Sequence, residues 1–189
     1  MKSVLISIQP KWCELIAIGK KIIEVRKTKP RIYTPFKCYI YCTKGGLNIY
    51  SNGKQYVTDS FEILKNGADE AFEETSTFRK WNGKVIGEFI CDKIRPIAIL
   101  AHIMVRTVDC MQSCLSACEI LEYADGKPVY GWHISNLKIY DKPKELSEFR
   151  KYISFYDDIS LSELENSGIS NLRIKRPPQD WRYVEGARI

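Results

Sequence analysis

The stretch that decides the fold, Val4 to Lys27, reads Val-Leu-Ile-Ser-Ile-Gln-Pro-Lys-Trp-Cys-Glu-Leu-Ile-Ala-Ile-Gly-Lys-Lys-Ile-Ile-Glu-Val-Arg-Lys. Its opening segment, Val4–Ile8, is mostly β-branched and apolar, which predicts a buried strand. Pro10 ends that strand and suits the first turn of a helix, where a backbone N–H is not needed. Gly19 predicts a left-handed helix end, and a strand pattern resumes at Ile22–Val25. The stretch therefore predicts strand, helix and strand in quick succession.

The predicted helix has two faces. Its apolar residues recur at helical spacing, at Trp12, Leu15, Ile16 and Gly19. The opposite face carries Lys11 and Glu14. We include Lys11 and Trp12 among the candidate ligand-binding residues, because a cation and an aromatic ring can pair with a phosphate and stack on a base.

Three charged residues follow the helix. Period-two alternation places Glu24 and Arg26 on one face of the second strand, with backbones about 6.5–7 Å apart, so the two side chains can form a charge-assisted pair. Lys21 lies in the turn, where alternation does not fix its direction. Two interpretations stay open for these three residues, a functional site and a structural ion pair.

Four sequence strings carry a resemblance to a known family. The residues Gly19, Lys21, Glu24 and Arg26 form a G-x-K-x-x-E-x-R string. The other three are Gly83–Phe89, Tyr130–Ser135 and Pro177–Glu185. In this order they resemble the ASCH domain, a PUA-like module, in its bacterial and phage forms. The resemblance implies a mixed β pseudo-barrel flanked by helices, with a cleft beside the barrel that is lined by the first string.

Composition sets the broad class. The chain has 189 residues, 44% of them hydrophobic and 28% charged, which is typical of a folded globular domain. A net charge of +6 favours contact with polyanions such as RNA. We expect a cytoplasmic protein without a membrane partner, because no apolar run is long enough to span a bilayer and no signal peptide precedes the first strand. The seven cysteines lie largely in apolar patterns, which favours reduced thiols.

The order of the expected elements indicates a mixed α+β fold, because strands outnumber helices and do not alternate regularly with them. We predict a single domain over residues 1–189 with a probable insertion at 43–82. Within the insertion, Asn52-Gly53 between apolar residues predicts a hairpin over Leu47–Thr58, and Ala68–Trp81 has a helical composition. Residues 97–108 and 130–140 predict further strands.

A second helix is expected after Ser116, whose hydroxyl and the Glu119 carboxylate match a capping box. Cysteines 110, 114 and 118 recur every fourth residue around this point. Their spacing fits neither an iron–sulfur nor a zinc motif, and the helix start leaves Cys114 outside, so we expect no metal and no cofactor.

Two further groups contain candidate ligand-binding residues. Trp132 and His133 are neighbours on a predicted strand and must point to opposite faces, so one is core and the other faces a cleft or solvent. The carboxy-terminal segment interleaves basic and aromatic residues, a pattern that suits single-stranded nucleic acid or a packed tail. Within that segment, Arg173 and Lys175 lie two apart and can face one ligand.

Two functions follow from the resemblance. The first is a binding module whose cleft accepts RNA or a modified nucleotide. The alternative is a hydrolase in which Lys21 and Glu24 are catalytic. Some small ASCH proteins are amidohydrolases that act on N4-acylated cytidine through a Lys, a Thr and a Glu, and Lys21 matches that Lys while Glu24 stands in place of the Thr. Other members are ribonucleases, for which Glu24 is the candidate base. A protein partner leaves no signature in the sequence.

Overall fold

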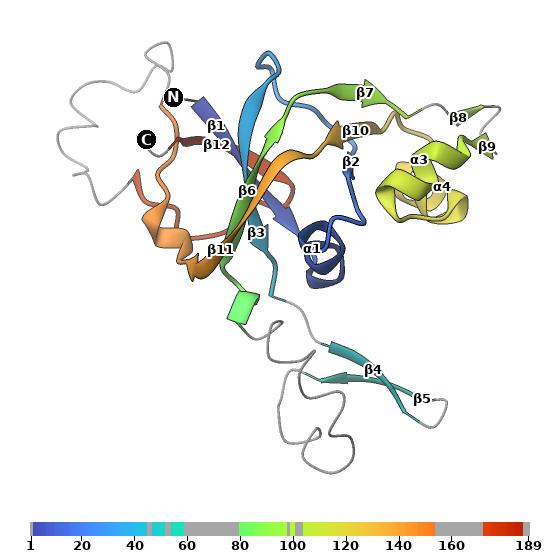
Figure 1. Ribbon diagram of the computed structural model, residues 1–189, viewed down its shortest axis with the longest axis horizontal. Coiled ribbons are helices and arrows are strands. Elements are labelled where there is room, and N and C mark those ends of the chain that lie inside the picture. Colours follow the sequence, from blue (N-terminus) through green and yellow to red (C-terminus); the bar gives the residue numbers. More distant parts are fainter. Residues whose placement is uncertain are drawn as a thin grey trace.

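The computed structural model describes residues 2–44, 47–51, 54–58, 80–97, 99–100, 104–153 and 172–186. These residues have an α+β architecture in which a five-stranded and a three-stranded sheet pack with three α-helices, and two further pairs of strands form two-stranded sheets (Figure 1). The elements in chain order are β1 (Lys2–Ile8), α1 (Pro10–Ala17), β2 (Ile23–Arg26), β3 (Phe36–Cys42), β4 (Leu47–Ser51), β5 (Lys54–Thr58), β6 (Val85–Cys91), β7 (Ile94–Pro96), β8 (Ile99–Leu100), β9 (Met104–Val105), α3 (Thr107–Ser113), α4 (Ala117–Ala124), β10 (Tyr130–His133), β11 (Ser135–Lys144), the 3-10 helix η2 (Leu146–Glu148) and β12 (Trp181–Glu185).

The main sheet has the strand order β11-β6-β3-β1-β12. Only its β1–β3 pair is parallel, so the sheet is mixed. A second sheet has the order β2-β10-β7. The largest core cluster joins the inner faces of β1, β3 and β6 to α1 and to Trp132 of β10. This confirms the predicted α+β class and is consistent with a PUA-like pseudo-barrel, although the two sheets are not joined into a closed barrel.

The β1–α1–β2 unit follows the sequence signals closely. Pro10 occupies the first turn of α1, and Gly19 has φ +73°, a left-handed conformation in which a Cβ would be strained. The helix buries Cys13 and Ile16 against the main sheet. Because β1 and β2 belong to different sheets, this unit links the two sheets and aims the start of β2 toward α3 and α4.

Helix α4 begins at the predicted capping box. The Ser116 hydroxyl accepts from the Glu119 backbone N–H at 3.2 Å, and the Glu119 carboxylate accepts from the Ser116 N–H at 2.8 Å. We expect Ser116→Ala to lower the free energy of unfolding by about 1 kcal/mol, because the Glu119 backbone N–H loses its side-chain acceptor. Urea denaturation of the variant would measure this. A change within error would show that water replaces the cap without cost.

Two segments differ from their sequence predictions. Among the described residues of the strand-like stretch 97–108, the strands are the short β8 and β9, and the end of the stretch already belongs to α3. The strand predicted over 130–140 is divided at Ile134 into β10 and β11, which lie in different sheets. The chain therefore changes sheets at a single residue, a feature that alternation alone does not reveal.

The predicted insertion is described only in part. Strands β4 and β5 pair antiparallel from Leu47–Thr58 to Ser51–Lys54, which confirms the hairpin, while its Asn52-Gly53 turn lies outside the described residues. Most of the helix predicted over Ala68–Trp81 also lies outside them. The status of 43–82 as an insertion in a single domain stays a prediction.

All seven cysteines are free thiols, as the sequence predicts. Within the described ranges, no helix combines the length and the apolar character needed to cross a bilayer. The carboxy-terminal strand β12 adds to the main sheet by pairing antiparallel with β1. Its Trp181 and Tyr183 pack against the core, which favours the packed-tail interpretation of these two rings.

Candidate functional site

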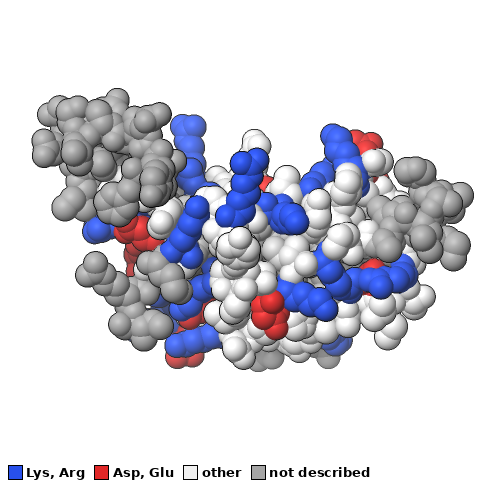
Figure 2. Space-filling model, turned by 90° about the horizontal axis from the view of Figure 1, so that it is seen from above, with Lys and Arg blue, Asp and Glu red and all other residues white. Residues whose placement is uncertain are grey.

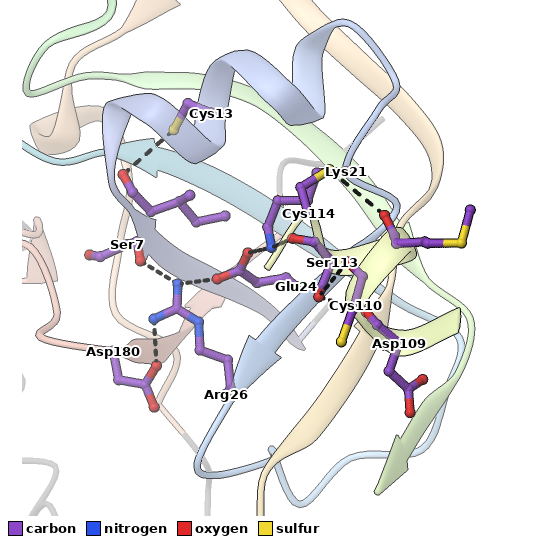
Figure 3. A network of polar contacts seen from close by, with 12 residues as sticks. Ser7, Cys13, Lys21, Glu24, Arg26, Asp109, Cys110, Ser113, Cys114 and Asp180 are labelled. Carbon is purple, nitrogen blue, oxygen red and sulfur yellow. Dashed lines mark hydrogen bonds and ion pairs between the residues drawn. The ribbon is translucent and has the colours of Figure 1, made fainter. Parts of the chain in front are cut away.

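Lys21, Glu24 and Arg26 converge on one charge network (Figure 3). Glu24 lies at its centre. Its Oε1 is 2.9 Å from Arg26 Nη2, and its Oε2 is 3.4 Å from Lys21 Nζ. Glu24 and Arg26 project from the same face of β2, as period two predicts. Lys21 turns toward the same point from the segment between α1 and β2.

Each cation of the network has a further partner from a distant segment. Lys21 Nζ donates to the backbone oxygen of Ser113, at the end of α3, at 2.7 Å. Arg26 Nη1 donates to Asp180 Oδ1 at 2.9 Å, and Arg26 Nη2 donates to the Ser7 backbone oxygen on β1. The charge network, defined here as Lys21, Glu24, Arg26 and Asp180, therefore ties together both sheets, α3 and the segment before β12.

The charge network is largely covered. Lys21, Glu24 and Arg26 are 2%, 5% and 9% exposed, and among the four residues only the Asp180 side chain, 35% exposed, reaches solvent to any extent. Burial disfavours the charged guanidinium of Arg26, but the nearby carboxylates of Glu24 and Asp180 raise its pKa above the ordinary value. Arg26 is therefore cationic despite its burial. The three predicted residues meet as expected, but they do not line an open recess.

Some hydrogen-bonding capacity in this region is unused. Glu24 Oε2, Arg26 Nε and Trp132 Nε1 are buried atoms without a hydrogen-bond partner. Trp132 lies directly opposite Glu24 in the β2–β10 pair, so its indole is on the same face of the sheet. Buried polar atoms are nearly always paired in folded proteins. Glu24 Oε2 faces the Lys21 ammonium at 3.4 Å as an ion pair, whereas Arg26 Nε and Trp132 Nε1 are enclosed by the protein without a hydrogen-bond acceptor.

Partly exposed side chains from α1 and α4 border the charge network. We call Lys11, Trp12, Glu119 and Tyr123 the rim. Lys11 Nζ and Lys21 Nζ lie 4.4 Å and 5.1 Å from the centre of the Trp12 ring, within cation–π range. The Ser116 hydrogen bonds, followed by the charges of Lys11 and Lys21, lower the pKa of Glu119.

Tyr123 of α4 is the last member of the rim. It is 38% exposed and stands near the Arg26 end of the charge network. Burial raises the pKa of its hydroxyl above the ordinary value. The Arg26 charge acts to lower this pKa, and the Asp180 and Glu24 carboxylates act to raise it. The rim thus offers a lysine and two aromatic rings beside buried charges.

A second buried carboxylate holds α3 in place. Asp109 is fully buried and pairs with Arg95 of β7 and with Arg106, whose Nε lies 3.0 Å from Asp109 Oδ2. The hydroxyl of Ser113 donates to the backbone oxygen of Asp109 at 2.6 Å. The backbone oxygen of Ser113 also accepts a hydrogen bond from the Lys21 ammonium. The ion pairs of Asp109 therefore help to hold Ser113 in position for the charge network.

The other predicted ligand-binding residues lie elsewhere. His133 is on the face of β10 opposite Trp132, and its Nδ1 lies 2.6 Å from Asp92 Oδ1. Trp132 is the core member of the pair, as alternation allows. Arg173 donates to the backbone oxygen of Ser147 in η2, and Lys175 follows it on the exposed surface. No interaction among the described residues links His133, Arg173 or Lys175 to the charge network.

Sequence reasoning missed several residues that complete the site. Ser7, Ser113, Tyr123 and Asp180 were not singled out, since each depends on a contact between distant segments, and Glu119 was predicted only as a helix cap. Asp180 lies within the Pro177–Glu185 string, which is the one signal that could have drawn attention to it. In the part of the chain that the structure describes, no three His, Cys, Asp or Glu side chains are grouped as metal ligands.

Comparison with known proteins gives a likeness in structure alone. No protein-family model matches the chain, and no significant relative was found among curated proteins. A crystal structure of a point mutant of the ASCH protein of Zymomonas mobilis aligns over 98% of this chain and 91% of that chain, with 14% identity and a TM-score of 0.54. The chain has the fold of an ASCH protein. A second mutant of the same protein aligns over 97% of this chain and 88% of that chain, with 14% identity and a TM-score of 0.52.

Proposed function

We propose that the protein is a nucleic-acid-associated binding module of the ASCH family, near its bacterial and phage members, and that RNA or a modified nucleotide binds at the rim. The ASCH fold and the four sequence strings support the family. The observation that carries the function is the convergence of Lys21, Glu24 and Arg26 beside the rim, which presents one lysine, one glutamate and two aromatic rings.

The rim supplies the groups that such a ligand needs. Lys11 is exposed and can pair with a phosphate, while the Trp12 and Tyr123 rings can stack on a base. Below them, Glu24 and Arg26 are buried, so they act on a ligand at the rim through their charge and by holding the rim side chains in place. The rim itself supports recognition by a phosphate contact and by stacking on a base.

The contacts of Lys21 favour binding over hydrolysis. A nucleophilic or basic lysine must be neutral and free to approach its substrate. The Lys21 ammonium instead donates to Ser113 and faces the Glu24 carboxylate, so both partners would have to be lost before it could react. The resemblance also lacks the amidohydrolase Thr, which Glu24 replaces. The catalytic assignment of Lys21 and Glu24 is therefore the weaker of the two proposals.

Binding can be tested by fluorescence titration with mononucleotides and a short single-stranded RNA at rising salt. We expect binding that weakens as salt rises, because phosphate contacts release counterions. Lys11→Ala should lower the magnitude of the logarithmic salt slope by about 0.7 for RNA. The matched control is Lys142→Ala on β11, which should leave the slope unchanged. Absence of RNA and nucleotide binding at low salt would contradict the proposal.

A separate assay distinguishes the hydrolase. The protein would be incubated with N4-acetylcytidine and with labelled RNA, and the products separated by chromatography. We expect both substrates to remain intact. Turnover that disappears in Lys21→Ala, with the variant shown to be folded, would instead favour the hydrolase.

A further inference from the structure

The loop that joins β2 to β3, residues 27–35, leads directly away from the charge network. It contains Lys27, Lys29 and Arg31 and no acidic residue. Lys29 and Arg31 are exposed. In Figure 1 this loop rises to the top of the molecule, and Figure 2, which looks onto that side, shows Lys and Arg side chains spread over the face with few acidic groups among them.

The loop is fixed at two points by the carboxy-terminal strand. The Thr28 hydroxyl donates to Asp180 Oδ2 at 2.9 Å and accepts from Trp181 Nε1 at 2.8 Å. The backbone N–H of Arg31 donates to the Tyr183 hydroxyl at 2.6 Å. These bonds hold the backbone in a defined path, so a ligand need not order the whole loop upon binding.

Two of the loop's lysines also have fixed surroundings. Lys27 Nζ lies 5.2 Å from the centre of the Tyr123 ring, and Lys29 Nζ lies 5.5 Å from that of Tyr130. Tyr123 belongs to the rim, so Lys27 connects the rim to the loop. The cations therefore form a path from the rim outward along the loop.

An aromatic side chain stands at the far end of this path. Tyr33 is 97% exposed, more than any other large hydrophobic residue of the described ranges. A ring presented in this way beside lysine and arginine can stack on a nucleobase while the cations pair with phosphates. Stacking of this kind needs an unpaired base, because the base faces of a duplex are covered by their neighbours.

We propose that residues 27–35 form a second binding surface, which holds a single-stranded polynucleotide that extends from the rim. Lys29 and Arg31 contact phosphates, and Tyr33 stacks on a base. The inference rests on the proposed function only for the identity of the ligand as RNA. We therefore expect an oligonucleotide to bind more tightly than a mononucleotide. The additional affinity should come from residues 27–35.

The test compares a fluorescein-labelled 12-nucleotide single-stranded RNA with a mononucleotide. The variants are Lys29→Ala/Arg31→Ala, Tyr33→Ala and Tyr33→Phe. A double variant of β11, Lys138→Ala/Lys142→Ala, is the control because it removes the same charge from exposed positions at the opposite edge of the main sheet. Thermal melting checks that each variant is folded.

We expect Lys29→Ala/Arg31→Ala to weaken RNA binding about tenfold or more and to reduce the magnitude of the salt slope by about 1.4, from two phosphate contacts. Tyr33→Ala should weaken it by about tenfold, and Tyr33→Phe should bind as the wild type does, because the phenyl ring still stacks. Mononucleotide binding should not change. Equal losses on single-stranded DNA would also support the surface, since none of these contacts needs the 2′-hydroxyl.

The proposal is overturned if Lys29→Ala/Arg31→Ala weakens RNA binding no more than the β11 control does. It is also overturned if Tyr33→Ala does not change the affinity for single-stranded RNA. A third contradicting result is duplex RNA that binds as tightly as the single strand and whose affinity falls equally in the variants. Failure of the proposed binding at the rim looks different. In that case mononucleotides do not bind, while the loop variants still weaken the oligonucleotide.

Discussion

Glu24→Ala is expected to lower the free energy of unfolding by about 3–5 kcal/mol, because it leaves two buried cations without their shared carboxylate. Lys21 and Arg26 are 2% and 9% exposed, so water cannot replace Glu24 without rearrangement. Chemical denaturation at pH 7 would measure the loss. A change of under about 1 kcal/mol would contradict this, since breaking a buried pair is far more costly than losing a surface one.

A triple variant separates the structural role of the charge network from its proposed function. In Lys21→Met/Glu24→Leu/Arg26→Met all three charges are replaced together by apolar groups. Such replacements are often neutral or stabilising, because the cost of burying the charges also disappears. We expect this variant to recover much of the stability that Glu24→Ala loses. A folded triple variant that no longer binds nucleotide would show that the charges serve binding.

Asp109→Ala is expected to cost about 3 kcal/mol at pH 7, the lower end for a broken buried pair. The carboxylate is fully buried, but its partners Arg95 and Arg106 have side chains 23% and 48% exposed and can be partly hydrated once it is gone. The loss should release α3, and with it Ser113, the partner of Lys21. Denaturation followed by circular dichroism would report it. Hydrogen exchange slowed rather than accelerated in α3 would contradict the assignment.

The same carboxylate predicts an acid-dependent loss of stability. Burial acts to raise the pKa of Asp109, but its hydrogen bonds and charge pairs with Arg95 and Arg106 prevail and lower the pKa below the ordinary 3.8. A depressed folded-state pKa gives stability that is present above the unfolded-state value and is lost as the pH falls through the folded one. The stability gap between wild type and Asp109→Ala should therefore be full at pH 7 and shrink below about pH 3.8. An unchanged gap at pH 2 would contradict this.

The first thirty residues show how much of the fold follows from sequence. Pro10 and Gly19 fix the ends of α1 through backbone geometry that few other residues adopt, and period two places Glu24 and Arg26 together. The capping box at Ser116 likewise predicts the start of α4. Each of these signals depends on a few neighbouring residues, so it can be interpreted without the contacts made by the rest of the chain.

Helix α3 was missed for a physical reason. It begins after Arg106 without a side-chain cap, and its first residues, Thr107 and Val108, are β-branched and favour strands. What holds it is the pairing of Asp109 with two arginines, one of them on β7. A helix stabilised by tertiary ion pairs leaves little local trace in the sequence.

The partners of the charge network could not be predicted for a related reason. Lys21 lies in a turn, where alternation gives no direction, and its acceptor is a backbone oxygen of residue Ser113. Arg26 pairs with Asp180, which is 154 positions away. Sequence patterns identify which residues carry charge, whereas long-range packing decides which of them meet.

That separation between Arg26 and Asp180 has a consequence for synthesis of the chain. A nascent polypeptide exposes β1, α1 and β2 long before Asp180 leaves the ribosome, and contacts of such large sequence separation form late. Until β12 docks beside β1, Arg26 lacks one of its two carboxylates. The ion pair between Arg26 and Asp180 therefore forms only after β12 has paired with β1, so the charge network is completed together with the main sheet.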